Sequence, residues 1–263
     1  GRDMEEIYPP RDVPAPQLSA PSVLAVKKLS RDGEFTDISF DIRAGEIVGF
    51  FGLIGSGRSE VMNTLFGMKH ISGGSITIDG ADVSIASPVD AINLGIGFVT
   101  ENRKEEGLVL SHSVEANISM VALKRYAGPL GFLKRRSERS AAIDEVRRLA
   151  IKTASLDTIV GSLSGGNQQK IVLAKWLLTN PKILILDEPT RGVDVGAKFE
   201  IYKIIRQLAA QGTAVVLVSS ELPEIIGMSD RVVVMSEGRM TATMSGDQIS
   251  PEAIMSFATG FIS

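Results

Sequence analysis

Apolar and polar residues alternate near the start of the chain, which is the pattern of β-strands. The clearest case is the segment 38–42 (ISFDI), in which every second residue is apolar. Strands are expected at 23–29, 38–42, 46–51, 75–78 with a partner at Val83, and 97–99. The preceding residues 1–21 are polar, contain five prolines and show no sustained apolar period. We therefore expect a linker or an extended arm over 1–21.

Helical spacing first appears after Gly57. The apolar residues within 61–66 are three and four positions apart, and they predict a helix that begins near Arg58 and ends near Gly67. The chain then becomes charged and rich in Ala and Leu, so we expect a mostly helical insertion over about 101–160. Within 137–150, one helical face is expected to hold Ala142, Val146, Leu149 and Ala150.

The remainder of the chain alternates between helical and strand patterns. Helices are expected over 165–178, over 197–210 and after Pro223, and strands over 183–186, 214–219 and 232–235. Strands that alternate with helices of about a dozen residues indicate a largely parallel sheet covered by helices. The expected fold class is therefore α/β.

Composition narrows the class without identifying a chemistry. The chain has 263 residues, of which 44% are hydrophobic and 22% charged, as is ordinary for a globular domain with a full core. A net charge of −3 gives no indication of nucleic-acid binding. The absence of cysteine excludes disulfides and thiolate metal sites, and His70 and His112 are too far apart in sequence to indicate zinc. No apolar run approaches the roughly 18 residues of a membrane span, so a membrane role requires a partner.

A glycine-rich loop, Gly52-Leu53-Ile54-Gly55-Ser56-Gly57-Arg58-Ser59, lies between a predicted buried strand and a predicted helix. Its glycines leave bare backbone for a phosphate, and the start of the helix offers unpaired N–H groups to that anion. The spacing is that of the G-x-x-x-x-G-K-[ST] motif, with Arg58 at the lysine position. Ser59 is expected to ligate Mg²⁺. A planar guanidinium does not replace a compact ammonium, so we expect binding to be retained and catalytic geometry to be altered.

An acidic pair follows the predicted strand 183–186. Ligand-binding groups gather at the carboxyl ends of parallel strands, which is where Asp187 and Glu188 lie. We expect Asp187 to bind Mg²⁺ through water and Glu188 to polarise the attacking water. The alternative is an acidic turn after a strand, which the glycine loop upstream disfavours.

The most specific segment is Leu163-Ser164-Gly165-Gly166-Asn167-Gln168-Gln169-Lys170, shortly before Asp187. With the glycine loop and the acidic pair, it resembles the signature of ATP-binding cassette (ABC) ATPases, and the resemblance covers essentially residues 22–245. It implies a P-loop NTPase cassette with a mainly parallel sheet, an antiparallel β subdomain and a helical insertion. A cassette domain over 22–263 is the expected organisation.

The resemblance also implies cofactors and site residues. ATP and Mg²⁺ are the expected ligands, and the residues expected to bind the nucleotide are Gly52, Leu53, Ile54, Gly55, Ser56, Gly57, Arg58, Ser59 and Glu60. The residues expected to serve an ATP bound by the opposite subunit of a head-to-tail dimer are Leu163, Ser164, Gly165, Gly166, Asn167 and Gln168. Asp194 occupies the position of the D-loop, where an aspartate helps two nucleotide sites communicate. A Ser164 that only caps a helix is the alternative interpretation of the signature.

Two further positions depart from the family pattern. Glu101 stands where a glutamine is common, and it is expected near the metal. Ser220 stands in place of the switch histidine, so the catalytic position lacks a cationic contact to the γ-phosphate. The only candidate to stack on adenine is Phe35, for which a place in the core is the stronger interpretation.

With these departures, the chain resembles the C-terminal cassette of bacterial sugar-import ATPases of the ribose, galactoside and xylose type. The shared segments are 57–59, 100–110, 163–170, 186–198 and 219–224. This resemblance implies a first cassette in the same polypeptide, membrane permease subunits gripped by the insertion, and a periplasmic sugar-binding protein acting indirectly. It places the chain at the cytoplasmic face of the bacterial inner membrane, with ATP hydrolysis driving sugar import.

Two alternatives stay open. A soluble, non-transport cassette acting in translation or DNA repair would typically carry basic arms or long coiled coils, and neither pattern is present. A nucleotide-binding regulatory half with little turnover is favoured by Arg58 and Ser220 and disfavoured by Glu188. The second alternative is compatible with the transport function.

Overall fold

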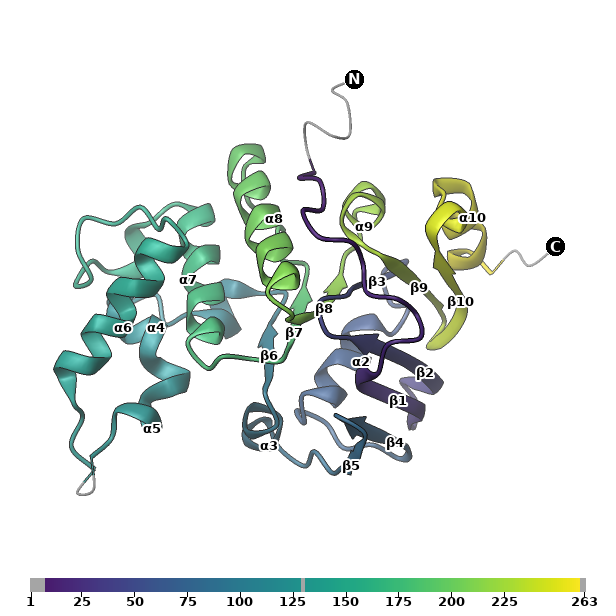
Figure 1. Cartoon of the computed structure of the whole chain (residues 1–263), viewed down its shortest axis with the longest axis horizontal. Coiled ribbons are helices and arrows are strands. Elements are labelled where there is room, and N and C mark those ends of the chain that lie inside the picture. Colours follow the sequence, from purple (N-terminus) through teal and green to yellow (C-terminus); the bar gives the residue numbers. More distant parts are fainter. Residues whose placement is uncertain (1–7, 129–130, 261–263) are drawn as a thin grey trace.

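The computed structural model describes residues 8–128 and 131–260, and a six-stranded sheet forms its centre (Figure 1). The strand order is β10-β9-β3-β8-β7-β6. The strands are β3 (Ile47–Gly52), β6 (Ile96–Val99), β7 (Ile183–Asp187), β8 (Ala214–Val218), β9 (Arg231–Ser236) and β10 (Arg239–Ser245). All neighbours pair in parallel except β10, which is antiparallel to β9. The predicted largely parallel sheet is confirmed.

A smaller antiparallel sheet packs beside the first, as expected. Its order is β2-β1-β4-β5. The strands are β1 (Ser22–Arg31), β2 (Phe35–Arg43), β4 (Gly73–Ile78) and β5 (Ala81–Val83). Phe40 of β2 meets Phe50 of β3 edge-on, with ring centroids 4.9 Å apart, so aromatic packing joins the two sheets.

Helices cover the sheets and form a lobe at one end of the molecule (Figure 1). The α-helices are α2 (Arg58–Leu65), α3 (Pro88–Asn93), α4 (Val114–Ser119), α5 (Leu123–Tyr126), α6 (Arg135–Arg148), α7 (Gly165–Leu177), α8 (Val195–Ala210), α9 (Leu222–Met228) and α10 (Pro251–Ala258). Short 3-10 or π turns lie at 103–107, 120–122, 160–162 and 246–248. Among the residues that the structure describes, no helix is both long and apolar enough to cross a lipid bilayer.

The lobe consists of α4, α5, α6 and part of α7, and its charged helix departs from the predicted face. Ala142 and Leu149 are buried and Val146 packs against the core, as expected. Ala150 is instead exposed in a left-handed conformation, with φ +47°, because α6 ends at Arg148 and the chain turns away. The buried positions that the pattern missed are Glu138 and Glu145.

Three elements at the edges of the fold were not predicted. α3 and α10 each begin with a serine N-cap and a proline in the first turn, at Ser87 and Ser250. These start signals were present in the sequence, and α10 also has apolar residues at helical spacing in Ile254, Phe257 and Ala258, which the prediction overlooked; α3 spans only six residues and shows no such period. β10 is rich in threonine and methionine and forms the edge of the sheet. Only one of its seven residues is buried, so its sequence lacks the apolar pattern of a central strand.

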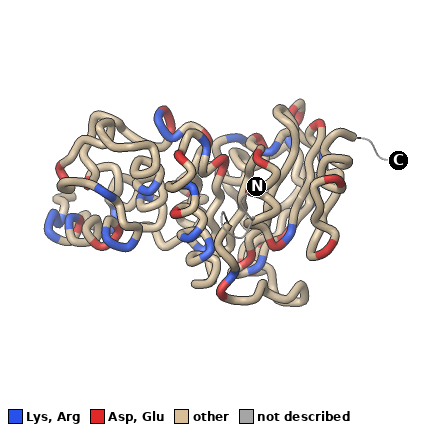
Figure 2. The backbone as a smooth tube through the Cα atoms, turned by 90° about the horizontal axis from the view of Figure 1, so that it is seen from above, with Lys and Arg blue, Asp and Glu red and all other residues tan. Residues whose placement is uncertain are grey.

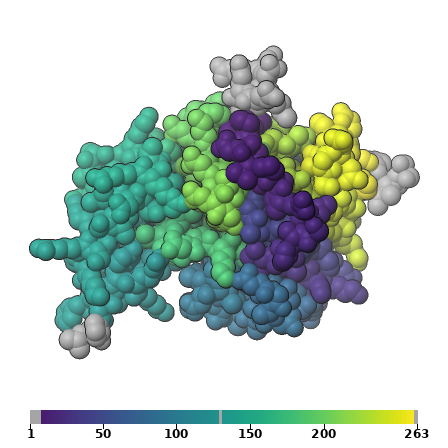
Figure 3. All heavy atoms as spheres, viewed as in Figure 1, coloured from purple at the N-terminus to yellow at the C-terminus, as the bar shows by residue number. Residues whose placement is uncertain are grey.

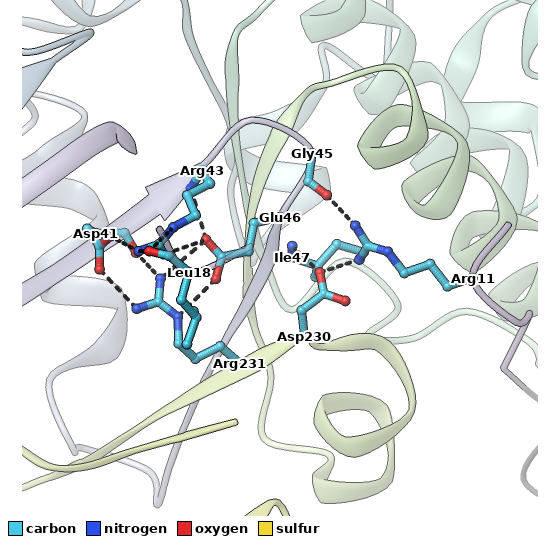
Figure 4. Close-up of polar contacts among 9 residues, drawn as sticks. All are labelled: Arg11, Leu18, Asp41, Arg43, Gly45, Glu46, Ile47, Asp230 and Arg231. Carbon is cyan, nitrogen blue, oxygen red and sulfur yellow. Dashed lines mark hydrogen bonds and ion pairs between the residues drawn. The ribbon is translucent and has the colours of Figure 1, made fainter. Parts of the chain in front are cut away.

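Positive and negative side chains are intermixed along the chain, as Figure 2 shows. One group of them is buried where β3 begins. Glu46 accepts hydrogen bonds from the Arg43 amide and from Nε of Arg231, both at 2.9 Å. Arg231 also pairs with Asp41 at 2.9 Å, and Arg43 Nη2 donates to the carbonyl of Leu18 at 2.6 Å (Figure 4). Each charge in this group therefore has a partner of opposite sign. Arg43 also holds the segment before β1 through the carbonyl of Leu18.

The segment 8–21, which we call the arm, lies across the outer surface near α8 and α9 (Figures 1 and 3). Arg11 of the arm binds the carboxylate of Asp230 and donates to the carbonyl of Gly45 at 2.5 Å. Asp230 in turn accepts the amide of Ile47 at 2.7 Å, so the arm is tied to the start of the central strand β3 (Figure 4).

We expect Glu46→Ala to lower the free energy of unfolding by about 1.5–3 kcal/mol, because the buried Arg43 and the partly exposed Arg231 lose their shared carboxylate and keep only Asp41. Guanidinium unfolding followed by circular dichroism measures the effect. Glu252→Ala, at an exposed carboxylate in the first turn of α10, is the matched control and should behave as the unmodified chain does. A loss for Glu46→Ala no larger than that of the control would contradict a stabilising role for this group.

Candidate functional site

Three strand ends meet at one edge of the central sheet. β8 lies between β3 and β7, with Val218 in register with Phe50 on one side and Asp187 on the other. Because the three strands are parallel, the loops after Gly52, Asp187 and Val218 leave the sheet together. This edge therefore collects the glycine loop, the acidic pair and the segment that contains Ser220.

The glycine loop joins β3 to α2 and is shaped by two left-handed glycines. Gly55 and Gly57 have φ of +81° and +94°, which glycine adopts without strain. A Cβ at Gly55 would meet no atom within 4 Å, so the space above the loop is open. Gly57 is the N-cap of α2, and no side chain caps that helix. Its first N–H groups are therefore available to an anion.

A cavity of about 350 Å³ lies over the loop. It is lined by Ile54, Gly55, Ser56, Gly57, Arg58, Ser59, Glu60, Glu101, Glu188, Arg191 and Ser220. The structure thus brings together most of the residues expected to bind the nucleotide, together with both altered positions, Glu101 and Ser220. Gly52 and Leu53 do not line the cavity.

Arg58 is turned toward the end of β8. Its Nη1 donates to the carbonyl of Ser219 at 2.7 Å and lies 3.9 Å from Oε1 of Glu188. The side chain is buried, and burial lowers the pKa of the guanidinium, while the carboxylates of Glu188 and Asp187 oppose that shift. An arginine stays charged under these conditions. Its charge therefore helps to hold the site together and is already partly engaged within the protein.

Glu188 has an unusual backbone conformation. It lies directly after β7 with φ +50°, a left-handed conformation that costs energy for a residue with a Cβ. Two hydrogen bonds hold it there: its amide donates to the Val218 carbonyl at 2.9 Å, and the Ser220 amide donates to its Oε1 at 2.7 Å. The carboxylate is thereby oriented at the cavity by the strand beside its own.

Asp187 and Ser59 form a pair of oxygen ligands that fits a magnesium ion. Burial raises the pKa of the Asp187 carboxyl to about 6, against the effect of its hydrogen bond with Ser59. Oδ1 of Asp187 and Oγ of Ser56 are buried without a hydrogen-bond partner in the protein. Mg²⁺ prefers one or two protein oxygens and completes its shell with phosphate and water. Accordingly, no group of three or more His, Asp or Glu side chains suited to a metal occurs within the described residues.

Two arginines at the cavity were given no role from the sequence. Arg191 forms an ion pair with Glu101 across the opening. Arg103 donates to the carbonyls of Arg191 and Gly192 at 2.6 and 3.0 Å. Together with Glu101 and Arg191, it lines a second cavity of about 410 Å³. Both arginines lie in segments that carried the family resemblance, 100–110 and 186–198, but their contacts join residues almost ninety positions apart, so no local pattern predicted them.

The signature segment lies at a different surface. Ser164 is the N-cap residue of α7, yet its hydroxyl does not cap the helix and instead accepts a hydrogen bond from the side-chain amide (Nδ2) of Asn167 at 2.9 Å. Gly166 has no room for a Cβ, which would come 2.5 Å from Ala197 of α8. The side-chain amide of Gln168 is buried and donates to the carbonyls of Val160 and Leu163 at 3.2 Å, so it braces the loop.

Asp194 lies beside the signature segment. It caps α8 by accepting the Ala197 amide at 2.9 Å. A cavity of about 290 Å³ is lined by Lys152, Ser164, Gly166, Asn167, Lys170, Asp194, Gly196, Ala197 and Glu200. This cavity shares no residue with the one over the glycine loop. The structure therefore does not bring the signature segment to the chain's own phosphate cradle.

Phe35 is buried, with 3% of its surface exposed, and belongs to the hydrophobic core. This agrees with the core interpretation and leaves it unsuited to stack on an adenine. Leu53 and Ile54, at the tip of the glycine loop, are the exposed apolar residues next to the cavity.

Comparison with known proteins agrees with this geometry. Residues 35–191 match the family described as ABC transporter. A putative ribose/galactose/methyl galactoside import ATP-binding protein of Rhizobium etli is 51% identical over 260 residues, which are 99% of this chain and 49% of that protein. The ribose import ATP-binding protein RbsA of Bacillus licheniformis is 50% identical over 260 residues, 99% of this chain and 52% of that protein. The chain spans about half the length of these relatives.

Solved structures share the fold at lower identity. The crystal structure of a nucleotide-free ATP-binding cassette from an ABC transporter superimposes with a TM-score of 0.77 at 21% identity, covering 89% of this chain and 98% of that one. A dimeric ATP-binding cassette in a post-hydrolysis state, bound to ADP and Pi, gives a TM-score of 0.70 at 22% identity, covering 84% and 98%. On its sequence, its fold and its relatives together, the chain belongs to the ABC transporter family.

Proposed function

We propose that this chain is an ATPase cassette, the second of two in a longer polypeptide, and that it couples ATP binding and hydrolysis to the import of a sugar. Its own nucleotide site has reduced activity, and its signature segment serves the ATP bound by the first cassette. In this organisation residues 1–21 link the cassettes, 22–263 form the second cassette, and about 101–160 form a helical subdomain.

The separation of the two cavities carries this proposal. The glycine loop, Glu188 and Ser220 line one cavity, whereas Ser164 and Asp194 line another. α7 begins at the second cavity without a side-chain cap, so its first N–H groups are free to receive an anion. A phosphate held by this chain therefore requires a second cassette to supply a signature segment, as in a head-to-tail dimer.

The chain's own residues account for binding. The amides of the glycine loop and the N-terminus of α2 bind the phosphates, and Ser59 and Asp187 hold the magnesium ion. Bound Mg²⁺ supplies charge neutralisation of the phosphates. Glu188 accepts a proton from the attacking water, held in place by the Ser220 amide at 2.7 Å. Glu101, paired with Arg191, lies at the opening and is available to approach the metal.

The reduced activity follows from Arg58 and Ser220. Arg58 is buried and already donates to the Ser219 carbonyl, so its charge is less available to the phosphates than that of a flexible lysine. Ser220 contributes its amide to Glu188 and carries no cationic group. One source of charge stabilisation is therefore missing from the transition state.

The names of the relatives support the substrate class and the partners. Import ATP-binding proteins for ribose or galactosides act with membrane permeases, and we infer permease subunits, gripped by the helical subdomain, as direct partners. A periplasmic sugar-binding protein takes part indirectly, and nucleic acid has no role. The chain then functions at the cytoplasmic face of the inner membrane, without a membrane span in its described helices.

We expect the chain to bind Mg-ATP, and Ser59→Ala to weaken that binding by about tenfold or more, as loss of a charge-assisted oxygen contact does. Isothermal titration with and without Mg²⁺ measures it. In EDTA, the difference between Ser59→Ala and the unmodified chain should disappear, because the hydroxyl acts through the metal.

Ser111→Ala, at an exposed serine away from both cavities, is the control and should leave the affinity unchanged. Absence of any nucleotide binding by chain that circular dichroism shows to be folded would contradict the proposal. An equal effect of Ser59→Ala in Mg²⁺ and in EDTA would contradict the metal role of Ser59.

We expect slow or undetectable ATP hydrolysis, and a gain of about tenfold or more when Arg58→Lys and Ser220→His are combined. The two changes add a flexible ammonium and an imidazole where negative charge develops, and single contacts of this kind contribute a hundredfold or so in rate. Steady-state phosphate release at high chain concentration is the measurement.

Glu188→Gln added to this double variant should abolish the gain. Ser164→Ala added to it should lower the rate as well, because two copies of the chain must supply each other's signature segment. Turnover by the unmodified chain as fast as that of the double variant would overturn the reduced-activity assignment. A gain insensitive to Ser164→Ala would overturn the head-to-tail arrangement.

A further inference from the structure

A buried carboxyl lies behind the site and takes no part in the functions described above. Glu224 is in the first turn of α9 and has only 1% of its surface exposed. Burial raises the pKa of this carboxyl, and hydrogen bonds with the hydroxyls of Ser219, Thr190 and Tyr202 oppose the shift. Thr190 Oγ1 donates to Oε1 of Glu224 at 2.9 Å. Three hydroxyls from three different elements therefore converge on one carboxyl.

Two of these partners flank Glu188. Thr190 follows it by two residues on the loop after β7, and Ser219 lies between the end of β8 at Val218 and Ser220. The Ser219 carbonyl accepts from Arg58, and the Ser220 amide donates to Oε1 of Glu188. Glu224 thus connects the loop that carries Glu188 to the segment that carries its hydrogen-bond donor.

The third partner leads to the arm. Tyr202 of α8 is fully buried, and the ring of Tyr8 packs on it with centroids 5.1 Å apart. Burial raises the pKa of the Tyr8 hydroxyl, and hydrogen bonding with the nearby Tyr202 side chain opposes that rise. Next to them, Arg206 donates to the carbonyls of Pro9 and Gly227 at 3.3 and 2.8 Å. The arm is therefore held against both α8 and α9, and Figure 3 shows it lying over that surface.

Stability alone does not account for this arrangement. A buried carboxyl surrounded by hydroxyls contributes little net free energy of folding, because the hydrogen bonds mainly offset the cost of removing it from water. What it provides is geometry: removal of any one partner leaves a buried polar group unpaired, so the segments that carry the partners are held in one relative position.

We propose that Glu224 is a positioning residue that holds Thr190 and Ser219 so that the Glu188 carboxylate meets the Ser220 amide, and that the docked arm supports it through Tyr8 and Tyr202. The inference deepens the proposed function and rests on it only in so far as Glu188 is the group that accepts the proton from water. The contact between Glu188 and Ser220 is made within the chain, so it can be measured separately from nucleotide binding.

Amide hydrogen exchange at Ser220, measured by NMR on the whole chain without nucleotide, tests the proposal. Thr190→Val and Glu224→Gln should each accelerate exchange at Ser220 by about tenfold, the loss of one hydrogen bond to a charged group. The amides of Val216 and Leu217 inside β8 should exchange at unchanged rates. Glu252→Gln, at an exposed glutamate in the first turn of α10, is the matched control.

The arm is tested with Tyr8→Phe, which removes the hydroxyl and keeps the ring. We expect about fivefold faster exchange at Ser220, the effect of a single neutral hydrogen bond. Val13→Ala, at an exposed residue of the arm, should have no effect. If the Ser220 amide exchanges as slowly in Tyr8→Phe as in the unmodified chain, the role proposed for the arm is wrong.

The positioning role of Glu224 is overturned if Thr190→Val and Glu224→Gln leave Ser220 exchange unchanged. It is equally overturned if all amides of β8 accelerate together, since that would mean a general loss of stability. Mg-ATP titration of the same variants keeps the two proposals distinguishable. A chain that binds no nucleotide refutes the proposed function, whereas Ser220 exchange still decides whether Glu224 positions Glu188.

Discussion

The parallel pairing of β3, β8 and β7 is the constraint on which the site depends. In parallel strands all carboxyl ends lie at one edge, so a glycine loop, an acidic pair and a serine pair that are far apart in sequence leave the sheet side by side. The register is set by buried apolar residues on both faces, and a slip would expose them. The buried group around Glu46 secures the opposite end of β3, where Arg43 and Arg231 share one carboxylate. Sheet packing thus fixes the strand ends before any side chain of the site makes a contact.

Local features of this site were predictable from the sequence, and contacts between distant segments were not. The phosphate cradle is local: glycines, a buried strand before them and a helix after them fix its geometry, and α2 begins at Arg58 as expected. The orientation of Arg58 toward Ser219 depends on a strand 161 residues away, and no spacing rule reports it. The left-handed conformation of Glu188 was hidden for the same reason, since Val218 and Ser220 stabilise it from the neighbouring strand. The edge strand β10 lacked a periodic apolar face, whereas α10 carried both its start signals, Ser250 and Pro251, and an apolar face, and was overlooked because it spans only eight residues.

The charges at the cavity are balanced around a position suited to a cation. Burial disfavours the ionised form of Asp187 and brings its pKa to about 6, while Glu188 and Glu60 act in the same direction. A divalent ion beside Ser59 would reverse that cost, because a cation stabilises a nearby carboxylate far more in a buried setting than in water. Arg58 supplies part of this compensation from within the protein, through its position near Glu188. Arg58, at the position where the motif has a lysine, therefore has two opposing effects. It stabilises the acidic edge, but its charge is engaged within the protein and is less available to the phosphates than that of a lysine.

The signature segment and the acidic edge belong to different surfaces, yet they are connected within the chain. Arg103 follows Glu101 by two residues and donates to the carbonyls of Arg191 and Gly192, and a Cβ at Gly165 would lie 2.9 Å from its guanidinium. A single side chain therefore touches the loop after Glu188 and the beginning of α7. Because the lobe of α4, α5 and α6 packs on α7, the distance between that lobe and the acidic edge is set partly by this contact. The two cavities share no residue, yet one arginine contacts both the loop that follows Glu188 and the beginning of α7. Because the Arg103 guanidinium is planar and presents several donors in a fixed geometry, it holds the two carbonyls of that loop in one position relative to the start of α7.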